Sequence, residues 1–126
     1  MYNDIEISNL GHTWIFDIDG TLVKHNGYKI DGFDTLLPGV KEFFETNIRE
    51  EDFVLLVTAR KTEYKDITEK FLLDNHIRFD KILYDLPTGE RVLINDRKPS
   101  GLNMSIAINT NRDEFIKDKI IINNDL

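Results

Sequence analysis

The stretch Trp14-Ile15-Phe16-Asp17-Ile18-Asp19-Gly20-Thr21-Leu22-Val23 places two carboxylates, two residues apart, where an apolar run meets a glycine. The run is rich in β-branched and aromatic residues, which favour a strand buried on both faces. Gly20 can adopt backbone angles that end such a strand. Because side chains at positions i and i+2 of an extended segment lie on the same side, we expect Asp17 and Asp19 to converge on one small volume.

Two negative charges held that close together are costly unless a cation lies between them. Oxygen ligands and a chain without cysteine favour Mg²⁺ as that cation. An isolated Asp-x-Asp is equally compatible with an exposed acidic turn after a strand. A calcium-binding EF-hand loop does not fit, because glycine stands at the fourth position of this stretch and Leu22 at the sixth.

The string D-I-D-G-T-L-V resembles the first motif of the haloacid dehalogenase (HAD) superfamily of phosphohydrolases. The resemblance extends over residues 14–108. It implies an α/β, three-layer Rossmann-like fold with a mostly parallel central sheet. It also implies that Asp17 is the nucleophile, that Asp19 transfers protons, and that Gly20 and Thr21 contact the substrate.

Short apolar runs alternate along the chain with helical patterns, which predicts a β-α-β series within one domain of residues 1–126. Lys24 to Asp34 is polar and contains glycine, so we expect a loop there. Residues 113–126 are either a frayed tail or, at Ile120 to Ile122, an added edge strand. Further strands are expected at Phe53–Val57, Lys81–Tyr84, Val92–Ile94 and Ser105–Ile108, and helices from Val40 and over Thr62–His76.

Ligands of open parallel sheets bind beyond the carboxyl ends of the strands, so the residues after each apolar run are candidates for a site. Thr58-Ala59-Arg60 follows the run Phe53–Val57. The Thr58 hydroxyl can donate to a phosphoryl oxygen, and Arg60 offers a planar fork for phosphate. Thr58 can instead cap the next helix or simply end the strand. The triplet resembles the second HAD motif, in the form with an arginine two residues after the threonine.

Asn95-Asp96 follows the apolar triplet at Val92. Asp96 can supply a third carboxylate, and Asn95 can supply a neutral oxygen ligand or a hydrogen bond to a metal-bound water. By itself the pair is also a common turn. As V-L-I-N-D the segment resembles the fourth HAD motif, in which a pair of acids is usual. The resemblance therefore implies a Mg²⁺ site made by Asp17, the backbone carbonyl of Asp19, Asp96 and Asn95.

The third HAD motif is a lysine that contacts the transferring phosphoryl group, and the corresponding position here holds Leu86. Arg91 and Lys98 are the nearest cations, ahead of Lys61 and Lys81. We expect Lys98 to take the role, because it follows Asp96 by two residues at the same edge of the sheet. The implied catalytic set is thus Asp17, Asp19, Thr58 and Lys98, with Arg60 binding substrate.

The resemblance implies a Mg²⁺-dependent phosphomonoester hydrolase that forms an aspartyl-phosphate. Neither interval in which HAD proteins carry a cap domain has room for one, so the chain looks capless. Its open site would be closed by a large substrate or by a second subunit, and capless relatives often act on phosphorylated sugars or similar metabolites. Two alternatives remain. One is a non-catalytic phosphate-binding scaffold. The other is a receiver-like signalling domain, but the first strand of a receiver ends in two adjacent acids, and Asp17-x-Asp19 does not match that pattern.

The composition of the chain limits which partners it can bind. The net charge of −7 argues against a general nucleic-acid or anionic-membrane surface. The longest apolar run, Phe53 to Val57, is far shorter than a membrane span, and the first ten residues lack a basic leader. With no cysteine in the chain, these features are typical of a cytoplasmic protein.

Overall fold

The computed structural model describes residues 3–126 and contains two parallel sheets. The larger has the order β2-β3-β4, formed by β2 (Thr13–Asp17), β3 (Phe53–Val57) and β4 (Lys81–Leu83). The smaller pairs β1 (Asp4–Ile7) with β5 (Lys119–Ile122). The prediction of an α/β fold with parallel strands is confirmed, and it is consistent with a Rossmann-like architecture.

The pairing of β2 with β3 determines where the candidate site residues lie, because the two strands run in register and end together. Asp17 pairs with Val57, so the residues after these two positions emerge at the same edge. Of the two alternatives for the C-terminal residues, a strand is present as β5, although it belongs to the smaller sheet. Its partner β1 was missed because Asp4–Ile7 alternates acidic and apolar residues over only four positions.

In the sequence, the helices lie between the strands of the larger sheet. The loop expected over Lys24 to Asp34 contains a one-turn helix, α1 (Gly27–Ile30). Helix α2 (Val40–Asn47) begins after Gly39, whose φ of 92° is the left-handed conformation that glycine adopts readily. The second expected helix divides into the 3₁₀ turn η1 (Thr62–Tyr64) and α3 (Lys65–Asp74).

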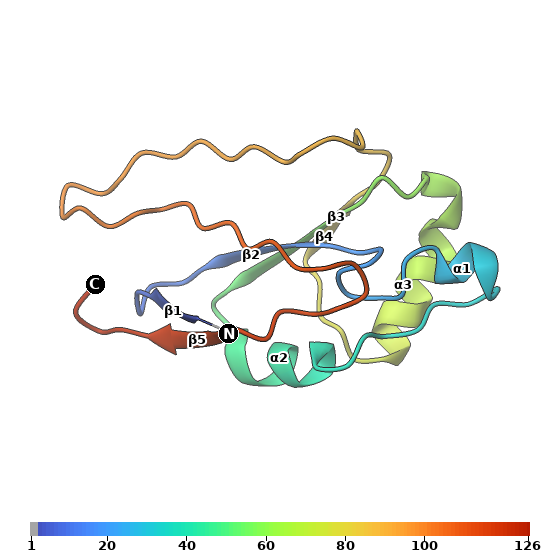
Figure 1. The fold of residues 1–126 in the computed structure, drawn as a ribbon, viewed down its shortest axis with the longest axis horizontal. Helices are drawn as coiled ribbons and strands as arrows, with labels where there is room; N and C mark the ends of the chain where they lie inside the picture. Colours follow the sequence, from blue (N-terminus) through green and yellow to red (C-terminus); the bar gives the residue numbers. More distant parts are fainter. Residues whose placement is uncertain (1–2) are drawn as a thin grey trace.

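The core lies on one face of the larger sheet, where Phe16 contacts two phenylalanines of α2, Phe43 and Phe44. Leu72 of α3 belongs to the same buried cluster. Alternation turns Ile15 to the opposite face, where its exposed fraction is 50%. Figure 1 shows α2 on one side of the sheet and a long extended segment passing on the other. The expected third layer of helices is therefore not seen among residues 3–126.

The long extended segment, residues 87–111, is here called the arm; all its residues except Leu102 are exposed. It leaves the domain after β4, turns near Gly101 and returns (Figure 1). The strands expected at Val92–Ile94 and Ser105–Ile108 are not formed, and Val92 and Ile94 are 80% and 90% exposed. Both predictions were wrong because β propensity makes a strand only where a neighbouring strand pairs with it.

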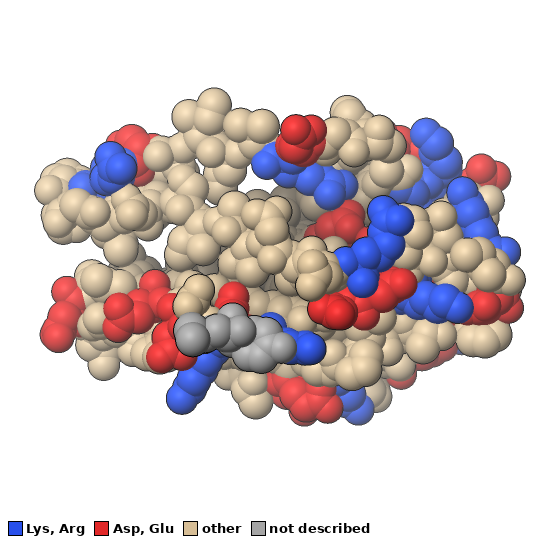
Figure 2. Space-filling model, in the orientation of Figure 1, with Lys and Arg blue, Asp and Glu red and all other residues tan. Residues whose placement is uncertain are grey.

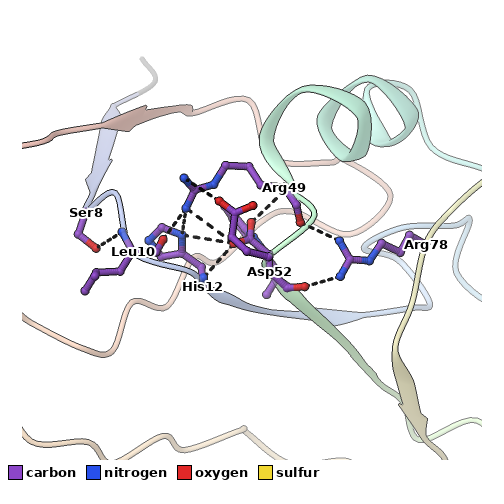
Figure 3. Close-up of polar contacts among 8 residues, drawn as sticks. Ser8, Leu10, His12, Arg49, Asp52 and Arg78 are labelled. Atoms are coloured by element: carbon purple, nitrogen blue, oxygen red, sulfur yellow. Dashed lines mark hydrogen bonds and ion pairs between the residues drawn. The ribbon is translucent and has the colours of Figure 1, made fainter.

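A polar cluster lies at the other end of β2 and β3, away from Asp17 (Figure 3). The buried Asp52 carboxylate accepts hydrogen bonds from the backbone N–H groups of His12 and Arg49, and from Trp14 Nε1. The Arg78 guanidinium donates to the backbone carbonyls of Arg49 and Asp52. The cluster fixes the entry into both strands, so it has a structural role rather than a catalytic one.

Among residues 3–126, no helix is long and apolar enough to cross a membrane.

Candidate active site

The turn after β2 carries the first candidate residues. The backbone N–H groups of Thr21, Leu22 and Val23 all donate to the Ile18 carbonyl, which closes a tight turn just beyond Asp17. Gly20 has a φ of 81°, in the region that side-chain-bearing residues rarely adopt. The hydroxyl of Thr21 donates to Asp17 Oδ2 at 3.2 Å. The sequence motif thus forms a compact loop that holds the Asp17 carboxylate.

Asp17 pairs with a cation from the arm. Arg91 Nη1 lies 3.2 Å from Asp17 Oδ1, and both side chains are partly exposed. Burial raises the pKa of Asp17, and the opposing effects of Arg91 and Thr21 do not fully offset it. Asp17 is partly exposed, so its carboxylate can still be approached by a ligand.

Asp19 pairs with a different arginine, which is buried. Arg60 Nη2 lies 2.7 Å from Asp19 Oδ1, and Arg60 Nε lies 3.2 Å from Asp19 Oδ2. On its other side Arg60 makes two 3.0 Å hydrogen bonds to Asp34, and its fifth N–H donates to Thr68 Oγ1 at 2.8 Å. All five guanidinium N–H groups are thus used within the protein, so Arg60 has no free donor for a phosphate.

The environment of Arg60 makes this network rigid. Its side chain is fully buried, and the Tyr28 ring lies 3.9 Å from Arg60 Cζ in a cation–π contact. Burial alone would lower the pKa of Arg60, but the hydrogen bonds and charges of Asp34 and Asp19 outweigh it and raise the pKa above its ordinary value. Arg60 therefore stays charged and holds the Asp19 carboxylate in one orientation.

Thr58 is buried directly beneath this network. Its Oγ1 accepts a hydrogen bond from the Arg60 backbone N–H at 2.9 Å, a local turn that fits the alternative reading of Thr58 as a strand end. The Thr58 backbone N–H donates to the Leu83 carbonyl of β4. The threonine thus helps to orient Arg60.

The remaining candidates lie on the arm. Asn95 donates to Asp96, and both line a shallow hollow with Arg97, near the arm's return leg. Lys98 sits in the turn at the arm's tip, where its backbone N–H donates to the Leu102 carbonyl. The sheet edge on which the choice of Lys98 rested is absent, and the cation that contacts Asp17 is Arg91.

The expected magnesium ligands come from two segments, because Asp17 and Asp19 lie at the end of β2 and in the turn after it, whereas Asn95 and Asp96 lie on the arm. Among residues 3–126, no group of three or more acidic, histidine or cysteine side chains is arranged to hold a metal. Asp17 pairs with Arg91, Arg60 binds the Asp19 carboxylate, and Asp96 contacts Asn95 on the arm. The donors present fit a single carboxylate contact and do not complete a Mg²⁺ site.

Sequence reasoning missed two sets of residues. Asp34 and Tyr28 complete the Arg60 network from a segment expected to be an unstructured loop, and no local pattern marks them. The second set is the return of the chain after the arm. The Asp113 backbone N–H donates to the Gly20 carbonyl, and Asp113 Oδ1 accepts from the His25 backbone N–H.

Figure 2 shows Lys, Arg, Asp and Glu side chains intermingled on the face that it presents, with no continuous basic surface there. This mixture agrees with the net charge of −7. Local basic groups can still contact a ligand, but broad electrostatic attraction of a polyanion is not a property of this face.

No protein-family model and no curated protein matches this chain. Two solved structures do. A chain of the Pnkp1/Rnl/Hen1 complex is 26% identical with a TM-score of 0.52, over 68% of this chain and 32% of that one. A chain of the Pnkp1/Rnl/Hen1 RNA repair complex is 27% identical with a TM-score of 0.52, over 72% and 30%. This chain thus spans under a third of the length of those chains.

Proposed function

We propose that this protein is a phosphomonoester hydrolase of the HAD type that acts through an aspartyl-phosphate. The observation that carries the proposal is the pairing at the end of β2, where Asp17 and Asp19 each have their own arginine, one from the arm and one buried. A partly exposed carboxylate beside a partly exposed cation suits nucleophilic attack on a phosphate, because the cation can stabilise the negative charge of the phosphoryl group.

The roles proposed for the side chains follow from these contacts. Asp17 attacks phosphorus, and Thr21 holds its second oxygen in place. Asp19 in its protonated form donates its proton to the leaving oxygen, and it then regains a proton from the attacking water. Arg60 positions Asp19 instead of binding phosphate, and Arg91 takes the phosphoryl contact first expected for Lys98.

Mg²⁺ remains the proposed cofactor, as the resemblance to HAD proteins implies. Its chemistry would be to neutralise charge between the carboxylate nucleophile and the phosphate dianion. Because the ligand set is incomplete among the described residues, the roles above use only side chains of this chain. A HAD-like fold, the cytoplasmic location and a second subunit covering the open site are likewise proposals.

The proposed substrate is a phosphorylated sugar or a related small metabolite. A second candidate is the phosphorylated end of an RNA, since both matching structures are of a Pnkp1/Rnl/Hen1 complex and one is described as an RNA repair complex. The acidic net charge of the chain favours the small metabolite over RNA as the substrate.

The test is release of inorganic phosphate from a panel of sugar phosphates, aryl phosphates and terminally phosphorylated oligoribonucleotides, each with Mg²⁺ and with EDTA. The proposal expects repeated turnover that stops in Asp17→Asn. A stable phospho-aspartate without turnover would instead support a receiver-like domain. Neither phosphorylation nor hydrolysis would support a non-catalytic scaffold.

A further inference from the structure

The chain that returns from the arm places an arginine over the active-site turn. A Cβ atom built on Gly20 would lie 3.3 Å from Arg112 Cγ and 3.6 Å from His25 Nδ1. Arg112 and His25 therefore both lie next to Gly20, which is one residue beyond Asp19 and three beyond Asp17. Figure 1 shows the returning segment, coloured orange to red, beside the blue turn that follows β2.

This placement is held by several independent contacts. The Asp113 backbone N–H donates to the Gly20 carbonyl at 2.8 Å, and Asp113 Oδ1 accepts from the His25 N–H at 2.7 Å. Asp113 has a φ of 66°, a conformation that costs free energy in a non-glycine residue. Two residues later, Phe115 is buried against Phe16 and Phe43. The backbone that follows Arg112 is thus fixed against the turn after β2 and against the core.

Among residues 3–126, the Arg112 side chain has no hydrogen-bond or ion-pair partner, and the residue is exposed. The other arginines near the turn differ, because Arg60 uses all its donors and Arg91 pairs with Asp17. Lys24 is also taken, since its ammonium pairs with Asp31 at 2.8 Å. A free guanidinium on a fixed backbone is prepared to bind an anion.

We propose that Arg112 and His25 form a second anion-binding subsite beside Asp17. The substrate is then a phosphomonoester that carries a second phosphate group, either as a small bisphosphate or as the phosphodiester next to the phosphorylated end of an oligonucleotide. This inference rests on the proposed function for the group that reacts at Asp17. The subsite itself binds the second phosphate group, which does not react.

The experiment measures binding in Asp17→Asn, which should bind substrates without turning them over. Its dissociation constants are compared by calorimetry for a sugar monophosphate, the corresponding sugar bisphosphate, and a terminally phosphorylated dinucleotide. We expect at least one two-phosphate probe to bind about tenfold more tightly than the monophosphate or better, the scale of a charge-assisted hydrogen bond. Adding Arg112→Ala should abolish that preference, and His25→Ala should reduce it.

Arg97→Ala is the matched control, because it removes the same charge from an exposed arginine that contacts Asn103 on the arm. It should leave the preference unchanged. Whichever probe depends on Arg112 identifies the source of the second phosphate. If neither probe depends on Arg112, or if Arg97→Ala weakens binding equally, the subsite is refuted. Retained phosphate release by Asp17→Asn would instead refute the proposed function, so the two failures are distinguishable.

Discussion

Arg91 Nη1 lies 3.2 Å from Asp17 Oδ1, so a cation carried by an exposed arm neutralises the carboxylate at the end of the first central strand. The neighbouring carboxylate, Asp19, is held by the fully buried Arg60. One pair is rigid and desolvated, whereas the other joins two partly exposed groups. This difference agrees with the proposed roles, in which Arg60 positions Asp19 and Arg91 contacts the transferring phosphoryl group.

Replacing Arg91 by alanine should lower kcat by about one hundredfold, the scale of losing a preorganised charge at a reacting centre. Lys98→Ala is the control, since Lys98 lies at the arm's tip, and its steady-state kinetics should match the wild type. The same assay with phosphate monoesters checks both variants. A large loss in Lys98→Ala together with a normal Arg91→Ala would return the phosphoryl contact to Lys98.

Asp17→Asn should abolish turnover while the protein stays folded, because an amide cannot attack phosphorus. Burial raises the pKa of Asp17, which means that folding disfavours its charged form. Removing the charge should therefore leave the free energy of unfolding unchanged or increase it, as measured in urea. Loss of cooperative unfolding in this variant would show that Asp17 is needed for the fold itself.

Asp19→Asn should keep the nucleophile and lose the proton transfer. In single-turnover phosphorylation, an alkyl phosphate should lose much more rate than an aryl phosphate, whose leaving group needs no proton. Equal losses for the two substrates would remove Asp19 from the role of general acid.

Arg60→Ala should destabilise the fold by about 3–5 kcal/mol, the usual cost of breaking a buried ion pair by deleting one partner. The reason is that Asp19 and Asp34 would both lose their hydrogen-bond donors, and Asp34 is almost completely buried. Urea unfolding measures the change, with the exposed Arg97→Ala as a control expected to differ little from the wild type. A small effect in Arg60→Ala would mean that water replaces the guanidinium without difficulty.

The Asp52 cluster predicts a pH dependence of stability (Figure 3). Burial alone would raise the pKa of Asp52, but hydrogen bonds from Arg49, Trp14 and His12 outweigh it, and the folded pKa lies below the ordinary value. The resulting stabilisation is therefore present above about pH 4 and is lost as the pH falls through the lower, folded pKa. Thermal unfolding from pH 7 to pH 2.5 should show a smaller acid-induced loss for Asp52→Asn than for the wild type.

Local patterns were sufficient wherever a residue's neighbours in sequence determine its structure. The apolar run Phe53–Val57 forms a strand with those bounds, and Gly39 precedes a helix as expected. The glycine in the turn after Asp17 has the positive φ that its place in the motif predicts. These features depend on backbone sterics and on alternating hydrophobicity, both of which can be read from a few consecutive residues.

Pairing between segments far apart in the sequence could not be predicted from such local patterns. Val92–Ile94 has the composition of a buried strand, yet it lies exposed on the arm because no strand pairs with it. The prediction for Lys98 depended on that strand, and Arg91 occupies the position beside Asp17 instead.

By itself, the sequence determined the parallel α/β class, the carboxylates after the first central strand and the arginine after the second. Only the tertiary structure decided what those groups contact: it turned Arg60 towards Asp19 and Asp34, brought Arg91 to Asp17 and set Arg112 over Gly20. The physical reason is that an arginine's function depends on which of its donors are left free. That is set by burial and by carboxylates far away in the chain: Asp34 and Asp19 lie 26 and 41 residues from Arg60, and Asp17 lies 74 residues from Arg91.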